Sequence, residues 1–349
     1  QDYEREELEK DLIFLGLCGI YDPPRVESHD AVRTCQQAGI RVHMCTGDHL
    51  ATATVISSMI GIVGQETNLE KQTINGPDFD HLAENDKLKD IPLDEMPLVI
   101  GRCSPQSKVY MVENLQSKGA VVAMTGDGVN DAPALKQADI GIAMGIRGTD
   151  VAKGASDLVL SDDNFATIVN AIEEGRRQYA NIRKFVRYLT SSNVGETIAV
   201  FINILLGWPL ILLPIQILWI NLVTDSVTAL SLSVEKAESN VMDEPPRSLD
   251  QPILDKDGFI MLGLFGAYIG LSSLALFGLY LDTSYALANS VSFTALVLLS
   301  NILVLNFRSF ERPLHKIGWF SNPWLIAAVF SMISGGNSGP GAVLSQSSV

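Results

Sequence analysis

The stretch AVVAMTGDGVNDAPAL, Ala120 to Leu135, decides the fold. A run of small and apolar residues enters a turn with two glycines and two aspartates, which is typical of a buried parallel strand that ends in a sharp bend. Asp127 and Asp131 follow the carboxyl end of that strand, where open α/β sheets bind their ligands. Two carboxylates at such a place favour Mg²⁺ together with a phosphate group.

Short apolar runs alternate with helical segments through the first half of the chain. This alternation predicts an α/β domain over residues 1–163 with a mostly parallel, doubly wound sheet. Residues 64–96 are polar, and we expect an irregular insertion there. Besides the opening stretch, the expected strands are Leu12–Ile20, Ile40–Cys45, Leu98–Gly101, Ile140–Ala143 and Leu158–Leu160.

From Asn164 the pattern changes to a long charged helix that becomes apolar and continues into a transmembrane domain at residues 164–333. Runs of about 20 apolar residues predict membrane-spanning helices. The last residues, 334–349, are rich in Gly and Ser and predict a disordered tail. We expect four complete spans near 186–206, 211–231, 259–281 and 287–307, and a truncated fifth at 323–333.

Charge and cysteine content restrict the class of protein. A formal net charge of −15 argues against nucleic-acid binding. The basic residues between the predicted spans all fall on one side of the bilayer, which predicts that this side and the α/β domain are cytoplasmic. The four cysteines show no CxxC spacing, as is typical of a reducing compartment.

Two predicted strands end in the same letters, Thr46-Gly47-Asp48 and Thr125-Gly126-Asp127. If these strands are neighbours, both turns lie at one edge of the sheet. The Thr46 hydroxyl and backbone N–H groups can hold a phosphoryl oxygen, Lys108 can neutralise another, and Asp127 with Asp131 can hold Mg²⁺. Such a group of side chains is suited to phosphoryl transfer, which depends on positioning and charge neutralisation.

A second group of polar residues lies inside the predicted membrane segments. Asn193 and Glu196 share one helix face, and Asn221, Thr224 and Asp225 lie on the next predicted span. Carboxylates within a membrane are costly and usually functional, and oxygen ligands suit Ca²⁺ or another hard cation. The alternative is that these side chains only hydrogen-bond the helices together.

The order of motifs along the chain resembles that of P-type cation-transporting ATPases of the calcium-pump-like branch. The motifs are DPPR, TGD, RCSPQSK, TGDGVNDAPAL, GIAMG, SDLVLSDDNF, SSNVGE, INLVTD and MDEPPR. The resemblance covers about Leu12 to Met332. It implies a haloacid-dehalogenase-like Rossmannoid phosphorylation domain, followed by an α-helical transmembrane bundle that corresponds to the C-terminal part of such a pump.

The resemblance also implies roles for individual residues. Thr46 and Lys108 would contact the aspartyl phosphate, Asp127 would ligate Mg²⁺, and Asn130 and Asp131 would complete the catalytic site. The residues implied on the ATP side are Thr46, Gly47, Asp48, Arg102 and Lys108. Those implied as ligands of a transported cation, Ca²⁺ first, are Asn193, Glu196, Asn221, Thr224 and Asp225.

The chain departs from the family's pattern in several places. The sequence lacks the DKTGT motif, which carries the phosphorylated aspartate of the family. It also lacks the TGES loop, the PEGLP-type helix break and most of the nucleotide-binding domain. Ser300 or Asn301 stands near the place of an acidic ligand of two-site calcium pumps. We therefore expect a fragment that is inactive without the N-terminal part of the pump.

Three alternatives remain open from the sequence. The first alternative is a sodium- or potassium-extruding pump of the same family, which the segments GIYDPPR and VHMCTGD resemble. A membrane-anchored phosphatase of the same fold would need its own nucleophile, for which Asp22 is the nearby candidate. A non-catalytic membrane protein or pseudogene product is the third possibility.

Overall fold

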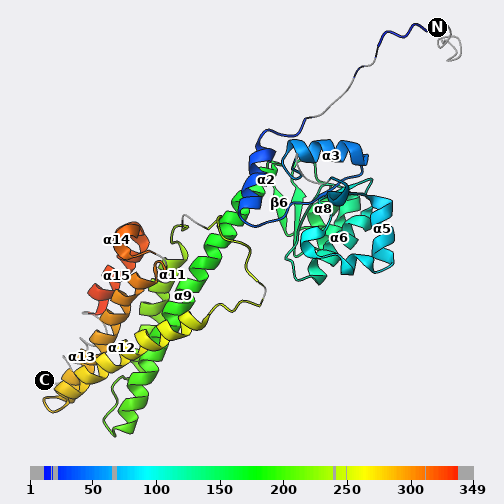
Figure 1. Ribbon diagram of the computed structural model, residues 1–349. Helices are drawn as coiled ribbons and strands as arrows, with labels where there is room; N and C mark the ends of the chain where they lie inside the picture. The colour runs from blue at the N-terminus through cyan, green and yellow to red at the C-terminus, as the bar shows by residue number, and fades with distance from the viewer. Residues whose placement is uncertain are drawn as a thin grey trace.

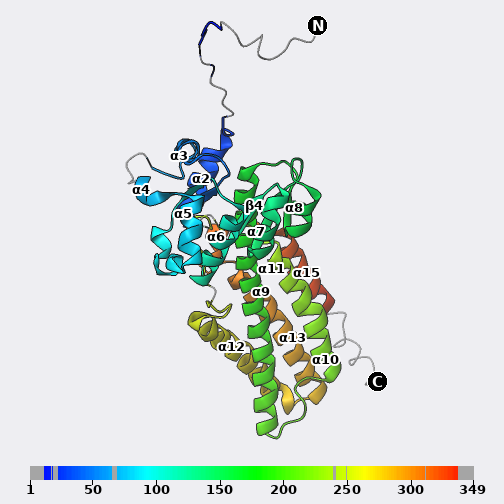
Figure 2. The same cartoon turned by 90° about the vertical axis from the view of Figure 1, so that its right-hand side faces the viewer.

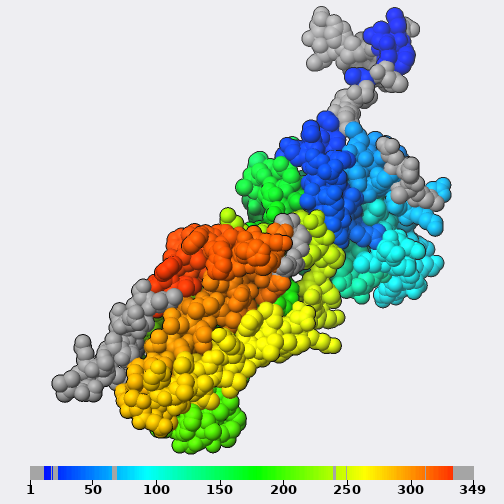
Figure 3. Space-filling view, turned by 60° about the vertical axis from the view of Figure 1, so that its left-hand side comes forward, coloured from blue at the N-terminus to red at the C-terminus, as the bar shows by residue number. Residues whose placement is uncertain are grey.

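The computed structural model of the protein describes residues 12–16, 18, 23–64, 69–238, 241–248, 250–310 and 312–336. An α/β part and a helical part are joined by one long helix, α9, which Figure 1 shows in green running from beside α2 to the far end of the molecule. Figure 3 shows the two parts as separate lobes, blue to cyan and yellow to red.

The first half of the α/β part is built on a parallel sheet in the order β1-β3-β2. Val99 and Ile100 of its central strand are fully buried, because helices pack over the sheet on apolar residues. Its elements are α2 (Glu27–Gln37), β1 (Met44–Cys45), α3 (Leu50–Met59), α4 (Leu69–Gln72), β2 (Thr73–Asn75), α5 (Gly76–Glu84), η1 (Lys87–Asp90), η2 (Leu93–Glu95), β3 (Val99–Gly101) and α6 (Pro105–Ser117).

A second parallel sheet, in the order β4-β5-β6, forms the other half. Helix α7 packs on α6 of the first half and so connects the two sheets. The elements of this half are β4 (Ala123–Gly126), η3 (Val129–Asp131), α7 (Ala132–Gln137), β5 (Ile140–Met144), α8 (Asp150–Ala155) and β6 (Leu158–Leu160).

The structure confirms the parallel α/β class and corrects three details. β1 and β4, whose TGD turns would share one edge if the strands were neighbours, belong to different three-stranded sheets. Residues 64–96 include strand β2 and helix α5 and are therefore not an irregular insertion. In the predicted strand Leu12–Ile20, the described residues 12–16 and 18 pair with no strand, and Leu12 to Leu15 are 73–95% exposed. The other residues of that predicted strand lie outside the described ones.

Helix α9 (Phe165–Leu205) is a single helix of 41 residues, as the uninterrupted pattern after Asn164 predicts. The Asn164 side chain caps it by accepting a hydrogen bond from the backbone N–H of Ala166. Near its start, α9 packs against α2, and the Arg176 guanidinium donates to the carbonyl of Ala38 at 2.9 Å. The same helix therefore contacts the α/β part and forms part of the helical bundle (Figure 2).

The rest of the bundle packs around the second half of α9. Three of its helices are long and apolar enough to cross a membrane, Pro214–Ser233, Lys256–Leu281 and Tyr285–Phe307. The first of these contains a π-helical turn between two α-helical parts. The elements are α10 (Pro214–Trp219), π-helix η4 (Ile220–Asp225), α11 (Ser226–Ser233), α12 (Lys256–Leu281), α13 (Tyr285–Leu303), η5 (Val304–Phe307), α14 (Leu314–Ile317) and α15 (Pro323–Gly336).

Helices α9 and α12 approach each other closely at small residues. A Cβ atom added to Gly270 would lie 2.4 Å from the carbonyl oxygen of Gly195, so no larger side chain fits there without a shift of the helices. Close backbone approach at glycines is a common way for membrane helices to pack. Here the contact fixes the part of α9 that carries Glu196.

Candidate functional site

The turn after β4 is organised by the side chain of Asp131. Its Oδ2 accepts hydrogen bonds from the backbone N–H groups of Asp127 and Gly128 at 3.1 and 3.0 Å. A Cβ atom at Gly126 would lie 2.5 Å from the Cβ of Asp131, so this position requires glycine. The TGDGVND motif therefore folds around an inward-pointing aspartate.

Lys108 reaches the same carboxylate from α6. Its Nζ lies 2.5 Å from Oδ1 of Asp131, and the two side chains are 20% and 7% exposed. Burial opposes the charged form of Asp131, but the hydrogen bonds from Lys108 and from the backbone N–H groups outweigh it and hold its pKa below the ordinary value. Lys108 and Asp131 therefore form an ion pair at neutral pH.

The Asp127 side chain is exposed. Both oxygens of Asp131 already accept hydrogen bonds, so Asp127 is the carboxylate that remains free for Mg²⁺. The residues present thus fit one part of a magnesium site, with Asp131 orienting the turn. Asn130 is also exposed on this turn.

Thr46 follows β1, and the structure connects it to Lys108 through α6. The carbonyl of Thr46 accepts from the backbone N–H of Cys103 at 2.9 Å, two residues before α6 begins. The pKa of the Cys103 thiol lies below its ordinary value, chiefly because of its hydrogen bond with the Cys45 thiol and also because Lys108 is near. Thr46 and Lys108 therefore lie in one region, and the Thr46 hydroxyl caps the turn at Asp48.

Arg102 lies beside an open cleft of about 660 Å³ between α3 and the β2–α5 segment. The cleft is lined by polar groups that include His49, Asn75 and Asp78. Arg102 has a left-handed φ of 53°, a conformation uncommon for a residue with a side chain, and its backbone N–H donates to the carbonyl of Asp48. The structure therefore places Asp48 and Arg102 side by side, and both are exposed.

A second site lies in the bundle, between α9 and the π-helix η4. Asn221 donates from Nδ2 to Oε2 of Glu196 at 3.1 Å, and the Tyr188 hydroxyl donates to Oδ1 of Asp225 at 3.3 Å. Glu196, Thr224 and Asp225 are 7%, 0% and 1% exposed. Two carboxylates are thus buried together, and no Lys or Arg among the described residues is hydrogen-bonded to either of them.

Three buried oxygens at this site have no hydrogen-bond partner: Oε1 of Glu196, Oγ1 of Thr224 and Oδ2 of Asp225. An unsatisfied buried polar atom costs about 1–3 kcal/mol, and more when the group is charged. A hard cation bound by these oxygens would remove that cost, so the donor set fits such an ion. This set holds two carboxylates, and no group of three or more His, Cys, Asp or Glu that could hold a metal occurs among the described residues.

The structure brings together four of the five predicted ligands. Asn193 is exposed, and its side chain is not among the hydrogen-bonded groups of this site. The π-helix shifts the residues of η4 relative to a regular helix, and π-helical turns often occur at functional sites. Tyr188 also belongs to the site, but its position in the sequence gave no signal of that role.

Ser300 and Asn301, on α13, are fully buried. Ser300 lies 3.3 Å from the Ser192 hydroxyl, and Asn301 accepts from Thr228 at 3.2 Å. These neutral groups satisfy one another, in contrast to the unpaired oxygens of the carboxylate pair.

Comparisons with known proteins agree with this arrangement. Residues 1–139 match the family model of haloacid dehalogenase-like hydrolases, and residues 209–335 match that of the C-terminus of cation transporting ATPases. The chain is 47% identical to the endoplasmic reticulum calcium ATPase srcA of Aspergillus fumigatus over 76% of its length and 27% of the relative's. It is 43% identical to calcium-transporting ATPase 1 of Bacillus cereus over 95% of the chain and 38% of that protein.

A third relative is the sodium/potassium exporting P-type ATPase cta3 of Schizosaccharomyces pombe, 46% identical over 77% of the chain and 27% of that protein. The chain therefore spans well under half the length of the curated relatives it matches. The protein is a membrane protein, as the family matches, the identities to these relatives and the apolar helices of the bundle all indicate. The chain belongs to the P-type cation-transporting ATPases.

Proposed function

We propose that this chain is the phosphorylation and cation-binding part of an ATP-driven pump that carries Ca²⁺ across a lipid bilayer. The observation that carries the proposal is the set of unpaired buried oxygens on Glu196, Thr224 and Asp225. Carboxylate, hydroxyl and amide oxygens suit Ca²⁺, which is bound by oxygen ligands. The calcium-transporting relatives support the same ion.

For the chemical step, we propose that an aspartate carboxylate attacks the γ-phosphorus of ATP, the bond to the bridging oxygen breaks, and ADP leaves. Thr46 and the backbone N–H groups of its turn would hold the phosphoryl oxygens, and Lys108 would neutralise their charge. Mg²⁺, held by Asp127, would supply further neutralisation when bound. Asp131 would keep Lys108 and the Asp127 turn in place, and Asn130 would complete the site.

The nucleophile of this step is not one of the residues assembled at the site. The carboxylates of the turn are Asp127 and Asp131, which have other roles, and the DKTGT motif is absent from the sequence. We therefore propose that an N-terminal part of the pump supplies the aspartate. The cleft beside Arg102 and Asp48 would face the bound nucleotide, and the α/β part would be cytoplasmic.

Binding of ⁴⁵Ca²⁺ to the chain in lipid nanodiscs tests the cation site. We expect saturable binding that Asp225→Asn weakens at least tenfold, because one of the two carboxylates is lost. Asp282→Asn, the same change at an exposed residue after α12, is the matched control and should bind as the wild type does. Equal binding by wild type and Asp225→Asn would refute the assignment.

Sodium is the second candidate, because one relative is named as a sodium/potassium exporter. Competition in the same assay separates the two ions. If Na⁺ at a concentration equal to that of ⁴⁵Ca²⁺ displaces most of it, the site prefers Na⁺, and the calcium proposal fails. If Ca²⁺ stays bound in excess Na⁺, the calcium proposal stands.

A further inference from the structure

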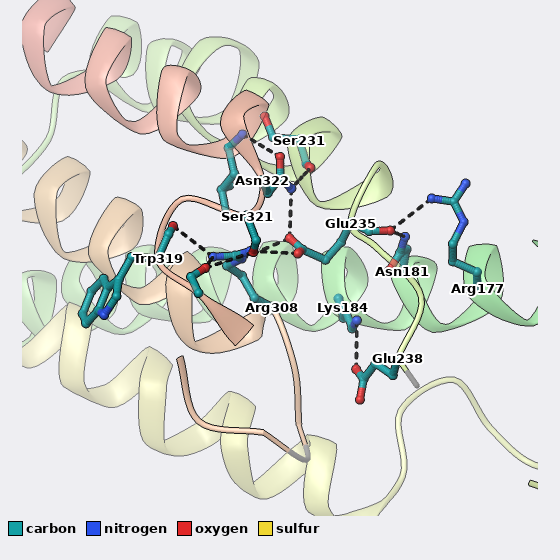
Figure 4. A network of polar contacts seen from close by, with 12 residues as sticks. Arg177, Asn181, Lys184, Ser231, Glu235, Glu238, Arg308, Trp319, Ser321 and Asn322 are labelled. Carbon is teal, nitrogen blue, oxygen red and sulfur yellow. Dashed lines mark hydrogen bonds and ion pairs between the residues drawn. The ribbon is translucent and has the colours of Figure 1, made fainter. Parts of the chain in front are cut away.

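A buried polar network lies where α11 ends, between α9, η5 and the segment that leads into α15. Figure 4 shows its residues converging on Glu235. Glu235 is 3% exposed and Arg308 is 1% exposed, so both charges are withdrawn from solvent. The proposed transport chemistry uses neither of them. We call this network the Glu235 joint; its members are Glu235, Arg308, Asn322, Asn181 and Arg177.

The carboxylate of Glu235 binds the elements on one side of the joint. Arg308 donates to it in a bidentate manner, from Nε at 3.1 Å and from Nη2 at 2.9 Å. Asn322 donates to the same carboxylate at 2.9 Å and also to the carbonyl of Ser231 in α11. Arg308 further donates to the carbonyl of Gly318 at 3.0 Å, so its remaining protons are used by the segment before α15.

The backbone of Glu235 binds the long helix on the other side. Its carbonyl oxygen accepts from Nδ2 of Asn181 at 2.8 Å and from Nη1 of Arg177 at 3.1 Å, both on α9. A second contact runs in parallel, from Nζ of Lys184 on α9 to Glu238 at 2.9 Å. Glu235 therefore connects α9 to α11, η5 and the start of α15 through one residue.

Both helices that leave this joint carry proposed cation ligands. Glu235 lies ten residues after Asp225, about 15 Å along a helix, and Asn181 lies fifteen residues before Glu196, about 22 Å. The opposite side of the joint reaches the α/β part, because Arg176, next to Arg177, donates to Ala38. The joint is thus the place where α9 is held to α11 between the two proposed sites.

A buried ion pair is weak evidence for stability, since an apolar pair of similar volume is often as stable or more so. Its best-attested role is to fix the register of packed helices. We propose that Glu235 and Arg308 are a positioning pair that fixes the register of α11 against α9 and so places Asp225 opposite Glu196. The effect on cation affinity rests on the proposed function; the effect on register does not.

The test compares three variants of the whole chain in nanodiscs. Glu235→Leu with Arg308→Met replaces the pair by apolar side chains and leaves no unpaired charge. Glu235→Arg with Arg308→Glu reverses the pair. Asn181→Ala removes one of the two hydrogen bonds from α9 to the Glu235 carbonyl, together with the bond to the Ser233 carbonyl, without burying a charge. Asp86→Asn at an exposed surface pair is the control. Melting followed by circular dichroism shows which variants fold.

Register is measured by electron–electron spin resonance between labels at Phe201 on α9 and Leu230 on α11. Both side chains are exposed, 61% and 71%, and the four native cysteines are replaced by alanine in this background. We expect a narrow distance distribution for wild type and for the reversed pair, and a shifted or broadened one for the apolar pair and for Asn181→Ala. A narrow, unshifted distribution in a folded apolar pair and in Asn181→Ala would overturn the proposal.

Calcium affinity gives the functional readout. We expect the apolar pair to bind ⁴⁵Ca²⁺ at least tenfold more weakly than wild type at an unchanged melting temperature, and the reversed pair to recover most of the affinity. A merely stabilising pair would change the melting temperature and leave the affinity of the folded protein unchanged. If wild type binds no Ca²⁺, the proposed ion is wrong, and the spin-label distances still decide the role of the pair.

Discussion

Nζ of Lys108 lies 2.5 Å from Oδ1 of Asp131, and this ion pair connects α6 to the turn after β4. Lys108 is the last residue of the RCSPQSK motif, and Asp131 is the last residue of the TGDGVND motif. The ion pair between them holds the two motifs together in one site. Asp131 also accepts from two backbone N–H groups of its own turn. The lysine that would neutralise a phosphoryl group is therefore positioned by an aspartate whose other oxygen is hydrogen-bonded to the backbone of its own turn.

The first prediction concerns the stability that Asp131 contributes. Asp131→Asn should lower the free energy of unfolding by about 1–3 kcal/mol at pH 7, because it weakens three hydrogen bonds to a buried carboxylate. The folded pKa is below the unfolded value of about 3.9, so this stability is present above that value and is lost as pH falls through the folded pKa.

Melting of both proteins in nanodiscs between pH 3 and pH 8 checks this prediction. The difference in melting temperature should be constant above about pH 5 and should shrink below about pH 4. Asp86→Asn, at an exposed ion pair with Lys89, is the control and should change stability by less than about 1 kcal/mol. A gap between wild type and Asp131→Asn that widens toward acid would contradict the assigned charge state.

The second prediction separates the cation ligands that the structure brings together from the one it does not. Thr224→Val should weaken ⁴⁵Ca²⁺ binding clearly, because the buried hydroxyl oxygen has no other partner. Asn193→Ala should have a much smaller effect, because Asn193 is exposed. Equilibrium binding to the chain in nanodiscs measures both, and an equal loss in the two variants would show that Asn193 turns inward when the ion binds.

These two sites show what the sequence could predict. The TGDGVND letters predict a turn with two carboxylates, because two glycines and two aspartates in that order have few other uses. They do not predict that both oxygens of Asp131 are taken by Lys108 and the backbone, since that depends on where α6 packs. Tertiary contacts therefore leave Asp127 as the free carboxylate.

The membrane ligands illustrate the same limit. Regular helical spacing groups Asn221 with Thr224, and it treats Asn193 and Glu196 as equals on one face. The structure makes Asn193 exposed and Glu196 buried, with the Glu196 carboxylate hydrogen-bonded to Asn221 of η4. The π-helix at η4 likewise depends on packing, and no residue pattern in INLVTD indicates it. The long helix α9 was predictable, since no proline interrupts 41 residues.

The third prediction tests the close contact of α9 and α12. Gly270→Ala should destabilise the bundle by about 1–3 kcal/mol and weaken cation binding, because its Cβ would lie 2.4 Å from the Gly195 carbonyl oxygen. Gly263→Ala on the same helix is the matched control, since a Cβ there meets nothing within 4 Å. Thermal melting and ⁴⁵Ca²⁺ binding measure the two effects, and equal behaviour of both variants would mean that the helices separate at no cost.

The fourth prediction concerns catalysis. The chain alone should form no acid-stable phosphoenzyme from [γ-³²P]ATP, because the proposed nucleophile is not among its residues. A chimera in which this chain replaces the matching part of the Bacillus cereus relative should form one, since the two are 43% identical over 95% of the chain. Labelling of the chain alone would refute the proposed division of the site.

Within that chimera, Lys108→Ala should lower phosphoenzyme formation by at least a hundredfold, the usual size of the loss when one electrostatic contact to a transition state is removed. Lys118→Ala is the matched control, because Lys118 lies just after the other end of α6 and donates to the carbonyls of Leu88 and Lys89, away from the turn. If both variants phosphorylate alike, Lys108 serves only to hold Asp131, and charge neutralisation at the phosphoryl group must come from elsewhere in the pump.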